Sequence, residues 1–239
     1  MQNKIEQIVV GGIETNCWLY ALEADESVAS TDATAEESAG KQPCIVIDPG
    51  EEAGIIASRL GELNWFPAYI FLTHGHIDHI AAIPELLGTI KKSGGAIPKI
   101  GIHPLDAHYL GEKSLKAHQD CMIAAGGSAA YVNTLWKPMP EADLLFAEGE
   151  TAGPFRILHL PGHTPGSVGF YDEKNNVLFS GDTLFRGSWG RTDLPGGNEA
   201  ELVQSLKRLL LMNKDTVVFP GHGPVTKIKD EQQLTGFFV

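Results

Sequence analysis

Three histidines and one aspartate crowd into the stretch THGHIDHI at 73–80, directly after the apolar run AYIFL. That run predicts a buried strand, so His74, His76, Asp78 and His79 stand in the turn that leaves its end. Imidazole nitrogens and carboxylate oxygens are donors that bind zinc and similar divalent metals. Chance would produce this spacing about once in a thousand sequences of this kind. The stretch therefore predicts a metal site.

Three later turns each add one residue of the same kind. They are LPGHTPGS with His163, LFSGDT with Asp182 and VVFPGHGP with His222. A single histidine or aspartate beside glycine is more often a turn residue or a helix cap. Here the pattern repeats after three apolar strands. Seven candidate ligands exceed the positions of one tetrahedral zinc site, which predicts two metals that share a ligand.

The motifs HGHIDH, PGHTPGS, SGDTLF and PGHGP, in this order, resemble those of the metallo-β-lactamase superfamily, with matches from about Ile5 to Thr226. The resemblance implies an α/β fold, a four-layer αβ/βα sandwich of two mixed β-sheets with helices on the outer faces. It implies His74, His76 and His163 on the first metal, Asp78, His79 and His222 on the second, and Asp182 bridging both. The expected cofactors are two divalent ions, zinc in the first place and iron or manganese as alternatives.

The run GDTLFRGSWGRTDLPGG at 181–197 is similar to glyoxalase II (hydroxyacylglutathione hydrolase), especially its short bacterial relatives, and to persulfide dioxygenases on the same scaffold. True β-lactamases differ from Asp182 at the bridging position. The resemblance therefore implies hydrolysis of a thioester such as S-lactoylglutathione.

Glutathione recognition rests on fewer residues. Arg191 occupies the place of a lysine that contacts glutathione in larger glyoxalase II enzymes, so it is a candidate substrate-binding residue. A surface ion pair with Asp193 explains Arg191 equally well. Asp193 replaces a usual tyrosine, and after His222 only residues 223–239 follow, without the helical segment that grips glutathione in those enzymes. Both departures leave the thiol part of the substrate open.

The expected mechanism follows from two metals that lower the pKa of a shared water from about 15.7 toward 7. The resulting bridging hydroxide would attack the thioester carbonyl, and Asp78 is expected to orient it as a catalytic residue. The alternative enzyme is a persulfide dioxygenase, which needs one iron on a two-His-one-Asp face. A non-catalytic metal-binding module is the further alternative.

Composition excludes several other classes. The formal net charge of −12 over 239 residues argues against nucleic-acid binding, because backbone phosphates would be repelled. The cysteines at 17, 44 and 121 form no CxxC pair, and we expect them in the core of a protein from a reducing compartment. No signal peptide or membrane span is evident. We expect one cytoplasmic domain over 1–239 that acts on a small molecule, and leave its oligomeric state open.

The sequence around these turns predicts short strands and helices, which would hold the turns in place. Strands are expected at 5–10, 18–22, 44–47, 69–72, 99–102, 155–160, 167–171, 177–180 and 216–219. Helices are expected over 51–63 with Ile55 on the apolar face, from Asp78 through Leu87, over 104–110, and after a cap at Asn198. Residues 23–42 read as a mobile insertion and 111–143 as an irregular, partly helical crossover. The pattern predicts two packed sheets with helices outside.

Several remaining residues are not expected to bind metal. We expect His103, His108 and His118 at the surface or at helix caps, and His159 to pack beside the site. Trp189 is the tryptophan expected at the mouth of the active site.

Overall fold

The computed structural model describes residues 4–23 and 40–237. The insertion expected at 23–42 therefore lies almost wholly outside the described residues.

The first sheet has six strands in the order β1-β2-β3-β4-β5-β6. They are β1 (Ile5–Val10), β2 (Thr15–Ala21), β3 (Gln42–Ile47), β4 (Trp65–Phe71), β5 (Lys99–Ile102) and β6 (Leu144–Leu145). β1 to β3 pair antiparallel, and β3 to β6 pair parallel. Parallel strands end at the same edge of a sheet. The turns after β3 and β4 therefore emerge side by side, and the second of them is the stretch 73–80.

The second sheet has six strands in the order β14-β13-β10-β9-β8-β7. They are β7 (Thr151–Ala152), β8 (Phe155–His159), β9 (Val168–Asp172), β10 (Val177–Gly181), β13 (Val217–Pro220) and β14 (Thr226–Lys227). β10 and β13 are parallel, and β8 runs the same way because β9 is antiparallel to both of its neighbours. The turns that carry His163, Asp182 and His222 leave these three strands. They therefore reach one edge of the sheet.

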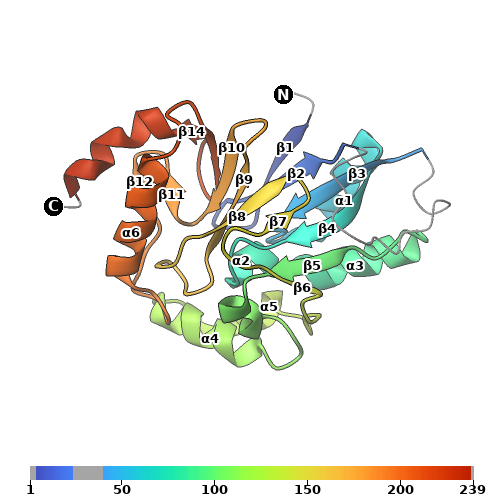
Figure 1. Ribbon diagram of the computed structural model, residues 1–239. Helices are drawn as coiled ribbons and strands as arrows, with labels where there is room; N and C mark the ends of the chain where they lie inside the picture. The colour runs from blue at the N-terminus through green and yellow to red at the C-terminus, as the bar shows by residue number, and fades with distance from the viewer. Residues whose placement is uncertain (1–3, 24–39, 238–239) are drawn as a thin grey trace.

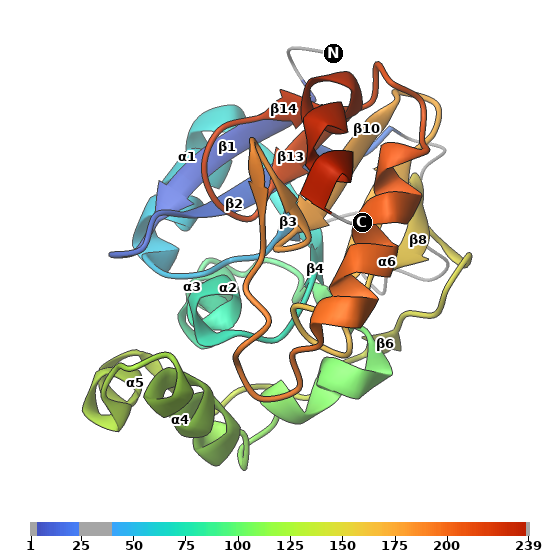
Figure 2. The ribbon, with the colours of Figure 1, turned by 90° about the vertical axis from the view of Figure 1, so that its left-hand side faces the viewer.

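The helices cover the outer faces of the two sheets. They are α1 (Ala53–Leu63), α2 (Ile77–Ile80), α3 (Ile83–Lys92), α4 (Leu115–Ala124), α5 (Ala129–Leu135) and α6 (Glu199–Leu210), with 3-10 segments η1 (Pro104–Tyr109) and η2 (Ile228–Phe237). Figure 1 shows α1 and α3 on one side of the strands and α6 with η2 on the other. The same layers are seen from the side of α6 in Figure 2. This is the four-layer αβ/βα sandwich that the sequence predicted.

Alternation of side chains along the strands divides the core into three parts. Tyr20 and Phe71 of the first sheet pack edge-on or tilted against Phe155 and Phe170 of the second, with ring centroids 4.8 and 5.4 Å apart for Tyr20–Phe155 and Phe71–Phe170. Intervening residues point to the helices on each side. Burial of each such aromatic ring contributes about 1.5–3 kcal/mol. The aromatic layer therefore holds the two sheets, and with them the two sets of turns, in one arrangement.

Most expected elements are confirmed, including the cap of α6, where the Asn198 side chain accepts a hydrogen bond from the Glu201 amide at 3.2 Å. The single helix expected from Asp78 through Leu87 is wrong, because α2 and α3 are separate. The Ala82 amide donates to the carbonyls of Pro49 and Gly50, outside the helical pattern, which ends α2. The crossover 111–143 carries two helices, α4 and α5.

The buried face expected for the first helix and the expected last strand were also wrong. Ile55, expected on the buried face of the first helix, is 49% exposed, whereas Ala53 and Ile56 are buried. β14 and η2 follow the strand that was expected to be the last. All three cysteines lie buried as free thiols, as expected. Among the described residues no helix has the length and apolar character to span a membrane.

Candidate metal centre

The turns at the strand ends bring seven side chains together, which we call the strand-end cluster: His74, His76, Asp78, His79, His163, Asp182 and His222. Donor atoms of His74, His76 and His163 lie within 4.8 Å of one another, and so do those of Asp78, His79 and His222. Asp182 lies between the two groups. Its Oδ2 is 3.6 Å from Nε2 of His163 and 3.6 Å from Nε2 of His222. All seven candidates from the sequence therefore meet at one place.

Two glycines allow this close approach. A Cβ at Gly221, the residue before His222, would lie 2.1 Å from Asp182 Oδ1 and 2.7 Å from the His79 ring. Gly181 has a φ of +50°, a left-handed backbone conformation, and a Cβ there would lie 2.4 Å from the Thr73 hydroxyl. The motifs SGD and PGH thus need glycine because no side chain fits where the turns meet.

The ring orientations of the histidines follow from partners behind the cluster. The Nδ1 atoms of His163 and His222 lie 2.7 and 3.2 Å from the carbonyl oxygens of Arg191 and Ile13. His79 Nδ1 lies 3.0 Å from the carboxylate of Asp48. These oxygens can only accept, so each Nδ1 carries a proton, and each Nε2 faces the cluster, where it can offer its lone pair to a bound cation.

Asp48 also orients the His74 ring, through Thr73. Its carboxylate accepts hydrogen bonds from the Thr73 amide at 2.8 Å and the Thr73 hydroxyl at 2.6 Å. That hydroxyl, having donated its proton, accepts from His74 Nδ1 at 3.1 Å. One buried carboxylate therefore orients one histidine in each group of the cluster.

Asp48 was not among the candidate residues predicted from the sequence. It is buried, has a φ of +52° and follows the buried strand β3. Its position directly after a strand is the signal that singled out Asp182, and it could have been found in the same way. Asp106 was also missed. It accepts from the amides of Gly75 and Gly166 at 3.0 and 2.8 Å and so ties two of the turns together.

The charges and unpaired atoms of the cluster fit a bound cation. The Nε2 atom of His74 and Oδ1 of Asp182 are buried and have no hydrogen-bond partner among the described residues, whereas His76 turns its Nδ1 toward His163 Nε2, at 2.9 Å. Buried polar atoms almost always have a partner. Burial, with neighbouring histidines, lowers the pKa of His74 and of His76 far below the ordinary value. Neutral imidazoles are the form that binds metal.

The second group carries the negative charge. Burial raises the pKa of Asp78, but His79 and His222 outweigh it and hold that pKa well below the usual range. Burial likewise lowers the pKa of His79, and the carboxylates of Asp78 and Asp182 more than reverse it. The Asp78 carboxylate thus stays ionised and attracts positive charge. The donor set suits divalent ions such as zinc, iron or manganese.

The other histidines lie outside the cluster. His103 caps η1 through its Nδ1 and stacks on His159 with centroids 4.2 Å apart. His159 lies beside the site with its Nε2 2.8 Å from the Pro165 carbonyl. The surface or cap position expected for His118 is wrong. It is buried on α4, with Nε2 2.9 Å from the Tyr109 carbonyl, because α4 packs against η1.

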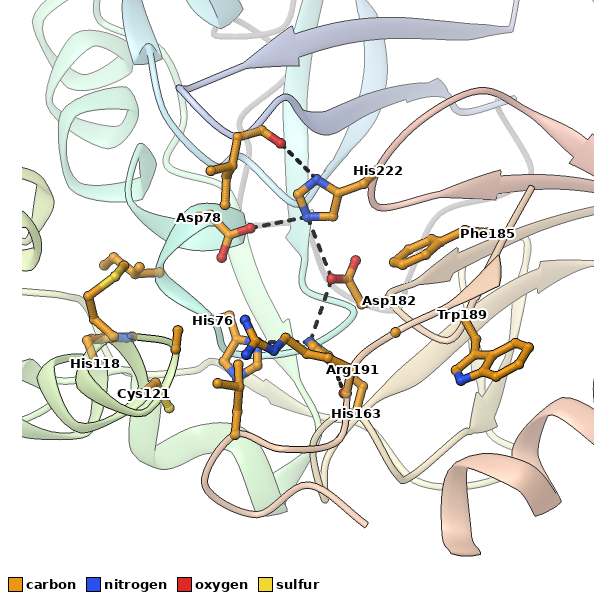
Figure 3. A pocket seen from close by; sticks show the side chains of 16 residues that line it. His76, Asp78, His118, Cys121, His163, Asp182, Phe185, Trp189, Arg191 and His222 are labelled. Atoms are coloured by element: carbon orange, nitrogen blue, oxygen red, sulfur yellow. Dashed lines mark hydrogen bonds and ion pairs between the residues drawn. The ribbon is translucent and has the colours of Figure 1, made fainter. Parts of the chain in front are cut away.

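A cavity of about 400 Å³ opens onto the cluster. Figure 3 shows His118 and Cys121 of α4 on one side and Phe185 and Trp189 on the other, with the cluster between them. Phe185 and Trp189 come from a hairpin of β11 (Leu184–Phe185) and β12 (Ser188–Trp189). Trp189 therefore lines the mouth, as expected. Arg191 lines the cavity too, and it also forms the ion pair with Asp193 that the sequence offered as the alternative.

Comparisons with known proteins agree with this geometry. The family model described as "Metallo-beta-lactamase superfamily" matches residues 37–222. Hydroxyacylglutathione hydrolase GloC from Haemophilus influenzae is 34% identical over 193 residues, which cover 80% of this chain and 85% of that protein.

Two solved structures resemble the whole chain. TTHA1623 in a di-iron-bound form is 32% identical, with a TM-score of 0.71 over 95% of this chain and 96% of that one. The BLEG-1 B3 metallo-beta-lactamase is 30% identical, with a TM-score of 0.74 over 98% and 99%.

Proposed function

The chain belongs to the metallo-beta-lactamase superfamily, and from this premise we propose that it is a single-domain, metal-dependent hydrolase that cleaves thioesters. The observation that carries the proposal is the pairing of two donor groups, each within 4.8 Å, around a shared aspartate. In the alternative dioxygenase, one iron on two histidines and one aspartate would leave the second group without a role. The convergence of Asp78, His79 and His222 supports the binuclear hydrolase instead.

We assign His74, His76 and His163 to the first metal, Asp78, His79 and His222 to the second, and Asp182 to both. Zinc is the first expectation. The di-iron form of the relative TTHA1623 supports iron as the alternative. When bound, such ions supply a Lewis acid for the carbonyl oxygen and a source of hydroxide near neutral pH.

Asp78 is the residue that we propose to orient the attacking water. Its carboxylate lines the cavity, and Oδ2 lies 3.3 Å from Nε2 of both His79 and His222. The Thr15 hydroxyl donates to the same Oδ2 at 3.2 Å, which restrains the carboxylate from a second direction. A restrained carboxylate that faces the cavity can accept a hydrogen bond from water and hold its lone pair toward the carbonyl carbon.

Three side chains that line the cavity, those of His118, Cys121 and Arg191, are poor proton donors for a leaving group at pH 7. Burial lowers the pKa of His118 to about 4, so this ring is neutral at pH 7. Burial raises the pKa of Cys121, and Arg191 stays charged. A thiolate leaves without a strong acid because its conjugate thiol has a pKa near 8.5, whereas the amine released from a β-lactam requires protonation. This difference favours a thioester as the substrate.

The test combines metal analysis with turnover. We expect the purified protein to bind two metal ions per chain and to hydrolyse S-lactoylglutathione after reconstitution with zinc or iron. Nitrocefin hydrolysis and oxygen consumption with glutathione persulfide are measured in parallel. One iron per chain with oxygen uptake, or faster cleavage of nitrocefin than of the thioester, would overturn the proposal.

A further inference from the structure

Arg191 is the only lysine or arginine among the described residues that line the cavity. Apolar side chains form most of the remaining wall beyond the cluster, including Ile13, Met122, Phe185 and Leu194. The chain as a whole has a formal charge of −12. A substrate that carries carboxylates would therefore depend on this single guanidinium.

The guanidinium is already paired. Its Nε and Nη2 donate to the two carboxylate oxygens of Asp193 at 2.6 and 2.8 Å, which is the two-pronged geometry that arginine and carboxylate prefer. The Arg191 hydrogen bonds, more than any other influence, lower the pKa of Asp193 to about 2. The pair is thus neutral overall at any pH near 7.

The backbone keeps Arg191 at the wall of the cavity. The Arg191 carbonyl accepts from His163 Nδ1 at 2.7 Å, and a Cβ at the preceding Gly190 would lie 1.9 Å from the Asp182 carbonyl oxygen. The segment is therefore packed against the cluster itself. Figure 3 shows Arg191 next to His163, with its side chain directed into the pocket. Asp193 follows two positions later, where its carboxylate meets the guanidinium.

We propose that the Arg191–Asp193 pair makes this cavity select thioesters whose thiol part carries no net charge. The inference rests on the proposed thioesterase function and names the substrate class within it. An anionic thiol such as glutathione would compete with Asp193 for one guanidinium and would meet the repulsion of its carboxylate. An uncharged thiol part meets the apolar wall without that cost.

Binding of thioethers, which the enzyme cannot cleave, tests the proposal without relying on catalysis. The probes are S-hexylglutathione, with two carboxylates and one ammonium group, and the uncharged S-hexyl-N-acetylcysteamine. Calorimetry with the metal-loaded protein gives both dissociation constants. We expect the uncharged probe to bind more tightly, by up to about fivefold, because the interaction of two exposed charges changes affinity by no more than about that factor.

Variants then test whether the Arg191–Asp193 pair causes the difference in affinity between the two probes. Asp193→Asn frees the guanidinium and should tighten S-hexylglutathione by up to about fivefold, while the affinity for the uncharged probe stays the same. The double variant Asp193→Asn with Arg191→Gln should lose that gain. Asp215→Asn is the matched control. It changes the net charge equally but opens the Lys229–Asp215 pair, at 2.9 Å, far along the chain from the cavity mouth.

The outcomes separate the two proposals. Equal or tighter binding of S-hexylglutathione by the wild type, or an equal response of Asp193→Asn and Asp215→Asn, would overturn the selectivity. So would failure of both probes to bind. If neither S-lactoylglutathione nor S-lactoyl-N-acetylcysteamine is hydrolysed, the thioesterase function fails, and the thioether affinities still decide the charge preference of the cavity.

Discussion

Replacement of Asp48 by asparagine should weaken both metal sites, although Asp48 belongs to neither group of the cluster. Asparagine tolerates the φ of +52° at this position and has nearly the same shape. In the native protein the carboxylate accepts from the Thr73 amide, the Thr73 hydroxyl and His79 Nδ1. If the asparagine oxygen keeps the amide of Thr73, its NH₂ group must face the other two partners.

The amide then reverses the hydrogen bonds behind the cluster. An NH₂ group donates, so His79 Nδ1 must become an acceptor and carry its proton on Nε2 instead. The Thr73 hydroxyl would accept from the amide and donate to His74 Nδ1, which moves the His74 proton to Nε2 as well. Both rings would then present N–H to the cations. Loss of such outer partners lowers metal affinity about 10- to 100-fold, or about 1.4–2.7 kcal/mol, at each site.

Competition with a chromophoric chelator measures both dissociation constants. Asp172→Asn is the matched control, because Asp172 is a buried carboxylate that accepts from the Asn175 amide at 3.0 Å and lies outside the cluster. We expect the control to lose stability without losing metal affinity. If Asp48→Asn binds both ions as the wild type does, the orientation of His74 and His79 by Asp48 is refuted.

Three further predictions test other parts of the site. Asp182→Ala should abolish binding of the second ion and turnover, and full turnover with two bound ions would contradict the shared ligand. Gly221→Ala should lower the free energy of unfolding by about 1–3 kcal/mol and weaken metal binding, since its Cβ would lie 2.1 Å from Asp182 Oδ1; Gly236→Ala, where a Cβ meets open space, is the control. Burial lowers the pKa of His118 to about 4 from the ordinary 6.5, so the unfolded chain takes up its proton first. Stability should be complete above pH 6.5 and fall by up to about 1.4 kcal/mol per pH unit as the pH drops toward 4. His118→Gln should flatten that slope in denaturant titrations at each pH, and an unchanged slope would rule out this histidine.

Residues whose role depends on local pattern can be predicted from the sequence. The donors of the strand-end cluster stand directly after apolar runs, and chain direction alone places such residues at strand ends. The N-terminal cap of α6 at Asn198 likewise depends on its own backbone neighbours. Ile55 was misplaced because helical periodicity does not say which flank of a helix the neighbouring sheet covers.

The donor set of the candidate metal centre was thus determined by the sequence, because the donor types and their place after each strand are properties of short segments. Only the tertiary structure decided how the donors are oriented. Asp48 reaches His79 because β3 and β4 run parallel and end side by side, and His118 is buried because α4 packs against η1. The pairing of Arg191 with Asp193, which the sequence left open, was decided by a backbone packed against Asp182 and His163. Each of these contacts depends on the distance between segments, which no local pattern contains.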